Sequence, residues 1–350
     1  MSSANPVSSI LVVGCLALTA AASRADCPGQ WLYGPEQGLP GLNDGVYDAT
    51  SWDPDGAGPE PELLIVGGIF TVAGQLPANR VAAWNGSAWQ PLGTGMDDQV
   101  GALVVYDGQL IAGGRFTTAG GVTCNSIARW DGLSWQALGE GMGGVNIPSV
   151  RTLTVYGGEL VAGGYFTTAG GAACNFIARW DGVSWQPLGV GMGGVSNPSV
   201  ADLTVHNGDL IAGGWFTTAG DAMCSYVARW DGSSWHPLGS GMDNQVSALT
   251  VYEGELIAGG YFTTADAVMC NCVARWDGLA WQPLGSGMDV TGDSPRVFAL
   301  TVYDGELVAG GWFTTAGGVP CYRIACWNGS SWAPVGSGVS AGMPPYDVPM

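Results

Sequence analysis

Lysine is absent from this 350-residue chain, and charged residues of any kind are scarce. They make up 11% of the sequence, and ten arginines face 29 aspartates and glutamates, for a formal charge of −19. Proteins bind a phosphate backbone through clusters of basic side chains, so this composition predicts no nucleic-acid partner. With 47% hydrophobic residues, the chain is too apolar for a disordered protein. Its 59 glycines keep no three-residue period, which excludes a collagen-like chain.

Long apolar runs are missing outside the N-terminus. Ile10–Ala22 is almost wholly apolar, and Ser23-Arg24-Ala25 follows with small residues where a signal peptidase needs them. Although a basic N-terminal segment is lacking, this pattern predicts a signal peptide cleaved near Ala25; the alternative is a buried N-terminal element. No other stretch reaches the ~20 apolar residues of a membrane helix. We therefore expect an exported protein, secreted or on the exterior of the cell envelope, with no membrane span.

One unit of 46 to 51 residues recurs six times from about residue 46 onward. Its first marker is Gly-Gly-x-Phe, ending at Phe70, Phe116, Phe166, Phe216, Phe262 and Phe313. Its second marker is W-[DN]-G-x-x-W, with tryptophan pairs at Trp84/Trp89, Trp130/Trp135, Trp180/Trp185, Trp230/Trp235, Trp276/Trp281 and Trp327/Trp332. A period of 40–50 residues is typical of propellers and of some solenoids.

The second unit illustrates four short strands and no helix. Residues 102–106 alternate and meet Asp107-Gly108, a strong hairpin signal, and 110–116 follows as an apolar strand. After a Gly-rich crossing at 117–124, strands are expected at 126–130 and 134–138, around a turn at Asp131-Gly132. Four antiparallel strands per unit form a propeller blade. The predicted fold class is therefore all-β, a six-bladed β-propeller of four-stranded antiparallel blades with an extra N-terminal strand.

The turn at Asp131-Gly132 makes a specific prediction for the tryptophans. If it has two residues, Trp130 lies opposite Leu133, and Trp135 is its diagonal neighbour on one face. The indoles would then fill the wedge that opens between blades. The aspartates of this turn, with positive φ expected at each, are Asp131, Asp181, Asp231 and Asp277.

The double glycine after an apolar strand, followed by W-D-G-x-x-W-x-x-L, resembles the kelch repeat. The series Gly-Gly-x-Phe-Thr-Thr-Ala-Gly with Ala-Arg-Trp-Asp-Gly is also similar to secreted bacterial propellers and to fungal cell-polarity marker propellers. The resemblance covers roughly residues 46–338, although the hairpin between the tryptophans is shorter than in typical kelch units. It implies the fold and no single function, because kelch-like propellers include enzymes, adhesins and scaffolds. Galactose oxidase, an enzyme of this kind, holds copper with two Tyr and two His, whereas here His206 and His236 lie at unrelated positions.

The ends of the chain leave the number of blades open. Gln30–Gly34 resembles a fourth strand ahead of the first unit, and residues 339–350 resemble the start of another linker. We favour a six-bladed ring with an extra N-terminal strand over a seven-bladed plan without most of its last blade. The expected organisation is a signal peptide at 1–25, a lead-in at 26–45, the propeller at 46–338 and a tail at 339–350, as a monomer.

With nine cysteines in the chain, disulfides and a metal or redox site are considered first. Eight, an even number, remain after Cys15 leaves with the signal peptide. Five precede the first tryptophan of their units by six residues: Cys124, Cys174, Cys224, Cys270 and Cys321. Bridges between equivalent positions need Cα atoms ~4.4–6.8 Å apart, which only the channel allows, so we interpret these five as packing residues. Cys27 and Cys326 lie outside the repeat pattern near opposite chain ends and are the predicted disulfide.

A second set of polar residues flanks the first hairpin of the units. These candidate rim residues are Tyr106, Tyr156, Glu159, His206, Asp209, Tyr252, Glu255, Tyr303 and Glu306. Symmetry predicts that they lie near the mouth of the central channel, where they would hold a sugar or a cation; an ordinary solvated rim is the alternative. Asp53-Pro54-Asp55-Gly56 is a fragment of a calcium loop without its Glu, so calcium is the one cofactor considered and none is predicted. No catalytic residue is predicted.

The sequence therefore favours a secreted, non-catalytic module that binds glycan or protein ligands or has a surface-structural role. The alternatives are an extracellular lyase or hydrolase that uses carboxylates and Tyr at the propeller funnel, and a passive matrix component. The variable residue of Gly-Gly-x-Phe suits either a binding surface or blade packing: Ile69, Arg115, Tyr165, Trp215, Tyr261 and Trp312. The side chains that line the channel, and any break of symmetry among them, decide between these hypotheses.

Overall fold

The computed structural model describes residues 41–56, 58–336 and 338, and every regular element within them is a β-strand. Across this part of the chain, no helix has the length and apolar character needed to cross a membrane. The predicted signal peptide, the strand at Gln30–Gly34, Cys27 and the tail from residue 339 lie outside the described residues.

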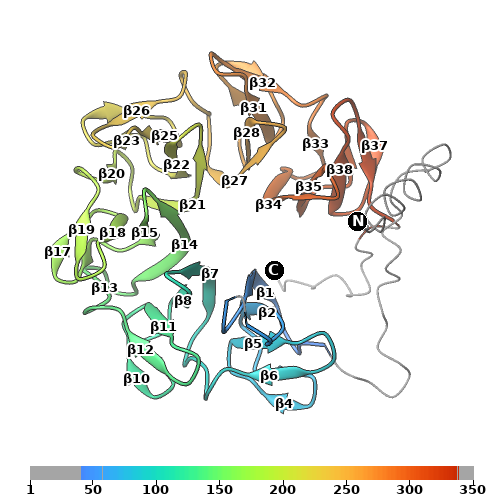
Figure 1. The fold of residues 1–350 in the computed structure, drawn as a ribbon. Helices are drawn as coiled ribbons and strands as arrows, with labels where there is room; N and C mark the ends of the chain where they lie inside the picture. The colour runs from blue at the N-terminus through green and yellow to red at the C-terminus, as the bar shows by residue number, and fades with distance from the viewer. Residues whose placement is uncertain (1–40, 57, 337, 339–350) are drawn as a thin grey trace, which may run out of the picture.

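Six four-stranded antiparallel sheets, blades 1 to 6, follow one another around a central axis (Figure 1). The innermost strands are β1 (Val46–Trp52), β7 (Val100–Tyr106), β14 (Ser149–Tyr156), β21 (Ser199–His206), β27 (Val246–Tyr252) and β34 (Arg296–Tyr303). The second strands are β2 (Leu63–Gly68), β8 (Gln109–Gly114), β15 (Glu159–Tyr165), β22 (Asp209–Trp215), β28 (Glu255–Gly260) and β35 (Glu306–Trp312). The third are β5 (Val81–Trp84), β11 (Ile127–Trp130), β18 (Ile177–Trp180), β25 (Val227–Trp230), β31 (Val273–Trp276) and β38 (Ile324–Trp327). The outermost are β6 (Trp89–Pro91), β12 (Trp135–Ala137), β19 (Trp185–Pro187), β26 (Trp235–Pro237), β32 (Trp281–Pro283) and β39 (Trp332–Pro334).

The crossing between second and third strands contains a small hairpin that the sequence interpretation missed. These hairpins are β3 (Val72–Ala73) with β4 (Leu76–Pro77), β9 (Thr118–Ala119) with β10 (Val122–Thr123), β16 (Thr168–Ala169) with β17 (Ala172–Ala173), β23 (Thr218–Ala219) with β24 (Ala222–Met223), β29 (Thr264–Ala265) with β30 (Val268–Met269), and β36 (Thr315–Ala316) with β37 (Val319–Pro320). In three blades the linker from the preceding blade adds a strand to this hairpin: β13 (Met142–Gly143), β20 (Met192–Gly193) and β33 (Met288–Asp289).

The two predicted hairpin turns have different outcomes. The first is confirmed, because Tyr106 pairs with Gln109 across a two-residue turn in which Asp107 and Gly108 have φ of 51° and 72°. The second prediction was wrong. Trp130 pairs directly with Trp135 across a four-residue loop, with the ring centroids 5.3 Å apart.

The carboxylate of the turn aspartate explains this longer loop. Oδ1 of Asp131 accepts hydrogen bonds from the backbone N–H groups of Leu133 (2.9 Å) and Ser134 (2.8 Å). The Asp131 N–H also donates to the Ser134 carbonyl, and within the loop only Gly132 has a positive φ, of 97°. The aspartate is therefore a turn residue, as expected, but it closes the turn through its side chain and not through a positive φ.

The hydrophobic core lies between the blades and joins each blade to the next. The cluster between blades 4 and 5, for example, combines Ile211 and Val227 with Leu256, Phe262 and Trp281, and each is at most 1% exposed. In blades 2 to 6 the second indole of each pair, on the outermost strand, also donates from Nε1 to the carbonyl of the leucine that precedes the linker into that blade, at 2.9–3.0 Å. The five repeat cysteines are 1–2% exposed, in agreement with their interpretation as packing residues.

Candidate functional site

A β-bulge near the start of each innermost strand shapes the wall of the central channel. In β14, for example, Val150 pairs with Gly164 and Thr152 with Gly163, which leaves Arg151 as the extra residue. The same register shift occurs in all six innermost strands. A bulge kinks the strand and redirects side chains, so each blade presents two consecutive residues at this level.

These bulges border a cavity of about 340 Å³ that contacts all six innermost strands. The extra residues in blade order are Tyr47, Gly101, Arg151, Ala201, Ser247 and Phe298, and the residues after them are Asp48, Ala102, Thr152, Asp202, Ala248 and Ala299. All but Ala102 line the cavity. The backbone repeats, but the side chains do not, so the channel is where the sixfold pattern of the sequence breaks.

Asp202 is the most perturbed carboxyl group of the cavity. Its Oδ2 accepts a hydrogen bond from the Leu249 N–H of the next blade (2.7 Å), and its Oδ1 accepts from the Leu203 N–H (2.8 Å). The Thr152 hydroxyl also donates to Oδ1, at 3.2 Å. Burial raises the pKa of Asp202 to about 6, and the negative charge of Asp48 also raises it. The three hydrogen-bond donors lower this pKa, but their effect is smaller than that of burial.

Asp48 occupies the equivalent position in blade 1. Its Oδ2 accepts a hydrogen bond from the Leu103 N–H of blade 2 (2.7 Å), and its Oδ1 accepts from the Ala49 N–H (2.8 Å). Burial raises the pKa of this carboxyl group as well. In blade 3, Thr152 Oγ1 accepts from the Leu203 N–H at 3.2 Å. The residue after the bulge thus links blades 1, 3 and 4 to their successors through a buried hydrogen bond.

The cavity wall also carries an arginine, a serine hydroxyl and two aromatic rings. The Arg151 side chain is exposed in the cavity wall and donates from Nη1 to Ser199 Oγ at 3.3 Å, and burial of its surroundings lowers its pKa. The Ser247 hydroxyl oxygen is buried and has no hydrogen-bond partner among the described residues. Tyr47 and Phe298, 52% and 49% exposed, line the cavity from blades 1 and 6. A buried hydroxyl without a partner is costly, which makes Ser247 a position where a ligand would be favourable.

The aromatic residues of the Gly-Gly-x-Phe motif lie beside this level of the channel. Ser149 at the start of β14 pairs with Tyr165, and Tyr261 lies 6.0 Å from the ring of Phe298. The Arg296 guanidinium lies over Tyr261, 5.1 Å from its centroid. An aromatic surface therefore extends outward from Phe298 over blade 5.

The predicted rim residues lie elsewhere: among the described residues, none of the nine lines the channel cavity. Three of their carboxylates form ion pairs with third-strand arginines, Glu159 with Arg179 (2.8 Å), Asp209 with Arg229 (2.6 Å) and Glu255 with Arg275 (3.0 Å). Tyr156 and Glu159 border a cavity of about 220 Å³ with Trp230 of the next blade, and Tyr252 and Glu255 border one of about 310 Å³ with Trp327.

Of the remaining rim residues, Tyr106 and His206 contact a neighbouring blade. Tyr106 packs against the core between blades 2 and 3. His206 is buried, and its Nε2 lies 3.0 Å from the Gly254 carbonyl. Tyr303 is 58% exposed, and the charge of Glu306 helps burial to raise the pKa of Tyr252. Tyr156, Glu159, Tyr252 and Glu255 thus lie in grooves between blades, whereas Tyr303 is exposed on blade 6.

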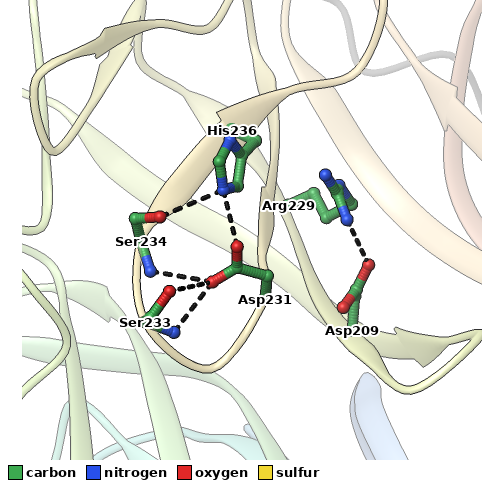
Figure 2. Close-up of polar contacts among 6 residues, drawn as sticks. All are labelled: Asp209, Arg229, Asp231, Ser233, Ser234 and His236. Carbon is green, nitrogen blue, oxygen red and sulfur yellow. Dashed lines mark hydrogen bonds and ion pairs between the residues drawn. The ribbon is translucent and has the colours of Figure 1, made fainter.

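Figure 2 shows a Ser-His-Asp cluster beside the Asp209–Arg229 ion pair of blade 4. His236 Nε2 lies 2.7 Å from Asp231 Oδ2 and 3.0 Å from Ser234 Oγ. A catalytic triad needs the carboxylate on one ring nitrogen and the nucleophile on the other. Because both contacts here are made by Nε2, the cluster belongs to the tryptophan hairpin turn and is not a nucleophilic site.

The cysteine and metal predictions have limited outcomes. Cys326 is 8% exposed on β38, where the other repeats have an arginine or, in blade 1, Ala83. Its pairing with Cys27 stays a prediction, because Cys27 lies outside the described residues. Within the described ranges, no group of three or more His, Cys, Asp and Glu side chains is arranged to hold a metal ion.

Comparisons with known proteins agree with this architecture. A family model described as a domain of unknown function (DUF5122) β-propeller matches residues 107–130 and 304–329. The chain is similar, over 82% of its own length, to the extracellular domain of a hybrid two-component system from B. thetaiotaomicron. The TM-score is 0.50 and the identity is 13%. The chain is a β-propeller.

The propeller spans 32% of that B. thetaiotaomicron structure. The computationally designed Ika8 protein has a TM-score of 0.47 and 17% identity, over 83% of the propeller and 74% of the designed chain. A search of curated proteins finds no match. At 13% identity the likeness to the B. thetaiotaomicron domain shows the fold alone.

The channel residues were missed at the sequence level, although the sequence marks them. Five of the six units carry Val-x-x-Leu at the start of the innermost strand, and blade 1 has Val46-Tyr-Asp-Ala49. The valine and leucine are constant in those five, and the two residues between them vary from Gly-Ala to Arg-Thr and Ala-Asp. Two variable positions inside a constant frame are the signal that would have identified the channel wall.

Proposed function

We propose that the propeller is an extracellular, non-catalytic binding module that takes a sugar residue of a glycan into the channel cavity. The observation that carries the proposal is the break of symmetry at the bulges, which gathers Arg151, Thr152, Ser247 and two carboxylates in one place. A volume of about 340 Å³ lies within the range of small-ligand sites, near its lower end.

The chemistry of the wall favours a neutral or amino sugar. Arg151 and the Ser247 hydroxyl are donors for sugar oxygens, while Asp48 and Asp202 accept from hydroxyl or ammonium groups. The rings of Tyr47 and Phe298 offer apolar faces for a sugar ring. The net charge of −19 opposes an anionic sugar.

An extracellular location is part of the proposal. It is supported by the apolar N-terminal segment that ends near Ala25, and one structure of similar fold is itself an extracellular domain. Expression with the native N-terminus in a secreting bacterial host, followed by N-terminal sequencing of the exported protein, tests it. A mature protein that starts near residue 26 is expected, and retention of the intact N-terminus in the cytoplasm would contradict it.

A glycan array tests the binding function. The full chain should bind a defined subset of neutral or amino-sugar glycans, and Arg151→Gln should lower binding at least tenfold. The matched control is Arg275→Gln, which removes an arginine of blade 5 that pairs with Glu255 outside the channel. Equal loss in both variants, or no glycan bound by the wild type, would refute the proposal and favour a passive structural role.

Hydrolysis is the second candidate, because two carboxyl groups with raised pKa share one cavity. The hydrogen bonds count against it. Both oxygens of Asp202 and of Asp48 already accept from backbone N–H groups, and these hydrogen bonds favour the charged carboxylate over the protonated acid that hydrolysis needs. Incubation of each array-bound glycan with wild type and with Asp202→Asn decides the question. New reducing ends or unsaturated sugars formed by the wild type alone would establish catalysis.

A further inference from the structure

One valine–glycine contact joins each blade to the next. The first glycine of each Gly-Gly pair, on the second strand, faces the valine that opens the bulge of the following blade. The pairs are Gly67 with Val100, Gly113 with Val150, Gly163 with Val200, Gly213 with Val246, and Gly259 with Val297. A Cβ on any of these glycines would lie within 2.6 Å of a valine Cγ1, which real structures do not tolerate. The contact is therefore a marker of a blade packed on its predecessor.

Blade 6 presents the same glycine without its valine. A Cβ on Gly310 would meet no described atom nearer than the Arg323 carbonyl oxygen, at 4.0 Å. On the same face Val308 is half-buried, whereas its equivalents in blades 1 to 5 are at most 1% exposed. Tyr303 is 58% exposed, against 5% for Tyr252, which packs on the tryptophan hairpin of the next blade. We call Tyr303, Val308, Gly310 and Ile324 the open face of blade 6.

Blade 1 is incomplete on the opposite side. Val46, its bulge valine, is 45% exposed, whereas the five equivalent valines are fully buried. Leu64 is 44% exposed, although Leu110, its counterpart in blade 2, is fully buried. In agreement with these exposures, β1 and β34 stand apart in Figure 1. Among the described residues, Val46 of blade 1 has no glycine partner in another blade, and Gly310 of blade 6 has no valine partner. The two residues therefore flank the same break in the ring.

The chain enters blade 1 as if it came from a preceding blade. Leu42 forms a β-bridge with Ala73, as Met96 in the linker between blades 1 and 2 does with Ala119. The Gly74 N–H donates to the Gly41 carbonyl, which repeats the Gly120–Gly95 bond of the next blade. Residues 41–43 thus occupy the place of an inter-blade linker.

The sequence after blade 6 repeats the spacing of the linker between blades 5 and 6. Val339 follows Trp332 by seven residues, as Met288 follows Trp281. Val348 follows Val339 by nine residues, as Val297 follows Met288. Val348 therefore holds the position of the bulge valine in a seventh unit, and it lies in a segment that begins where blade 6 ends.

We propose that residues 347–350, which align with the first half of β34, dock on the open face of blade 6 where the innermost strand of a further blade would begin, with Val348 against Gly310. The ring is then built on seven blade positions, and blade 6 does not close directly on blade 1. The occupant of the open face is this segment of the same chain. The proposal does not depend on the glycan function.

Cysteine pairs in the full chain test the contact. Valine Cβ atoms in the existing contacts lie 3.1–3.2 Å from an ideal glycine Cβ in blades 1, 3, 4 and 5, close to the ~3.8 Å of a disulfide. The pair Gly310→Cys with Val348→Cys should form an intramolecular disulfide under mild oxidation, detected by peptide mass mapping. Gly259→Cys with Val297→Cys is the positive control.

Each other outcome overturns the proposal. A disulfide in the pair Gly310→Cys with Val46→Cys, and none with Val348→Cys, would show that the ring closes with six blades. A disulfide that links two molecules would place a second copy on the open face. No disulfide at Gly310, with the control bridged, would mean that neither segment covers it.

A second measurement keeps the proposal testable where the cysteine variants fold poorly. Gly310→Ala should lower the thermal midpoint by the same few degrees as Gly259→Ala, because its methyl group would meet Val348. Val348→Ala should restore the midpoint in the double variant, and Val46→Ala should not. An unchanged midpoint in Gly310→Ala would contradict the docking of residues 347–350.

Discussion

Substitution of Gly259 tests whether the valine–glycine contact holds neighbouring blades together. A Cβ at this position would lie 2.6 Å from Val297 Cγ1 and 3.1 Å from Leu300 Cδ1. Both side chains belong to the next blade, and Val297 is fully buried. Gly259→Ala therefore overpacks the interface between blades 5 and 6, which costs about 1–3 kcal/mol of unfolding free energy. For a domain of this size, that corresponds to a fall of about 2–6 °C in the thermal midpoint.

The double variant separates this clash from a general effect of the new methyl group. Val297→Ala alone removes two buried methyl groups and should cost about 2 kcal/mol. In that background the 2.6 Å contact with Cγ1 is gone and only contacts of 3.1 Å remain, so the substitution should cost clearly less than in the wild type. Thermal unfolding followed by tryptophan fluorescence measures all four proteins. An equal cost of Gly259→Ala in both backgrounds would refute the contact, because independent sites add and touching sites do not.

Three further predictions follow from the channel and the core. Burial raises the pKa of Asp202 from 3.8 to about 6, so the folded chain retains a proton that the unfolded chain has lost, and stability should fall as the pH rises from about 4 to 6. The two-unit shift corresponds to about 3 kcal/mol, and thermal midpoints across this pH range should fall less in Asp202→Asn than in wild type. Trp281→Phe removes the Nε1 donor to the Leu238 carbonyl (3.0 Å) and should cost about 1–3 kcal/mol in thermal unfolding, while the exposed Leu279→Ala should be neutral. The buried thiols of Cys124, Cys174, Cys224, Cys270, Cys272 and Cys321, with raised pKa, should react with a thiol reagent at about pH 8 only after denaturation; rapid labelling of the native protein would contradict their packing role.

The repeat made most of the blade predictable from the sequence. Asp107-Gly108 determines the register of the first hairpin through backbone conformation alone, which is a local property. The register of the tryptophan hairpin was mispredicted because the Asp131 carboxylate caps two backbone N–H groups and lengthens the loop. A dipeptide pattern does not reveal such a side-chain contact.

The channel was less predictable, because it depends on three-dimensional closure. Asp202 and Arg151 are separated from their partners in the next blade by 47 and 48 residues. Only the ring brings them to one axis, and the Val-x-x-Leu frame around each bulge does not by itself show that the two residues inside it face the channel. The rim residues were the natural choice from the sequence because they repeat, but three of their four carboxylates are paired with arginines in the grooves.

A crystal structure of the propeller with the most strongly bound array glycan tests the central claim most directly. The account predicts a sugar residue in the channel cavity, within hydrogen-bond distance of Arg151 and Ser247 and against the ring of Phe298. A glycan bound only in the outer grooves beside Tyr156 or Tyr252, with the channel unchanged, would contradict it.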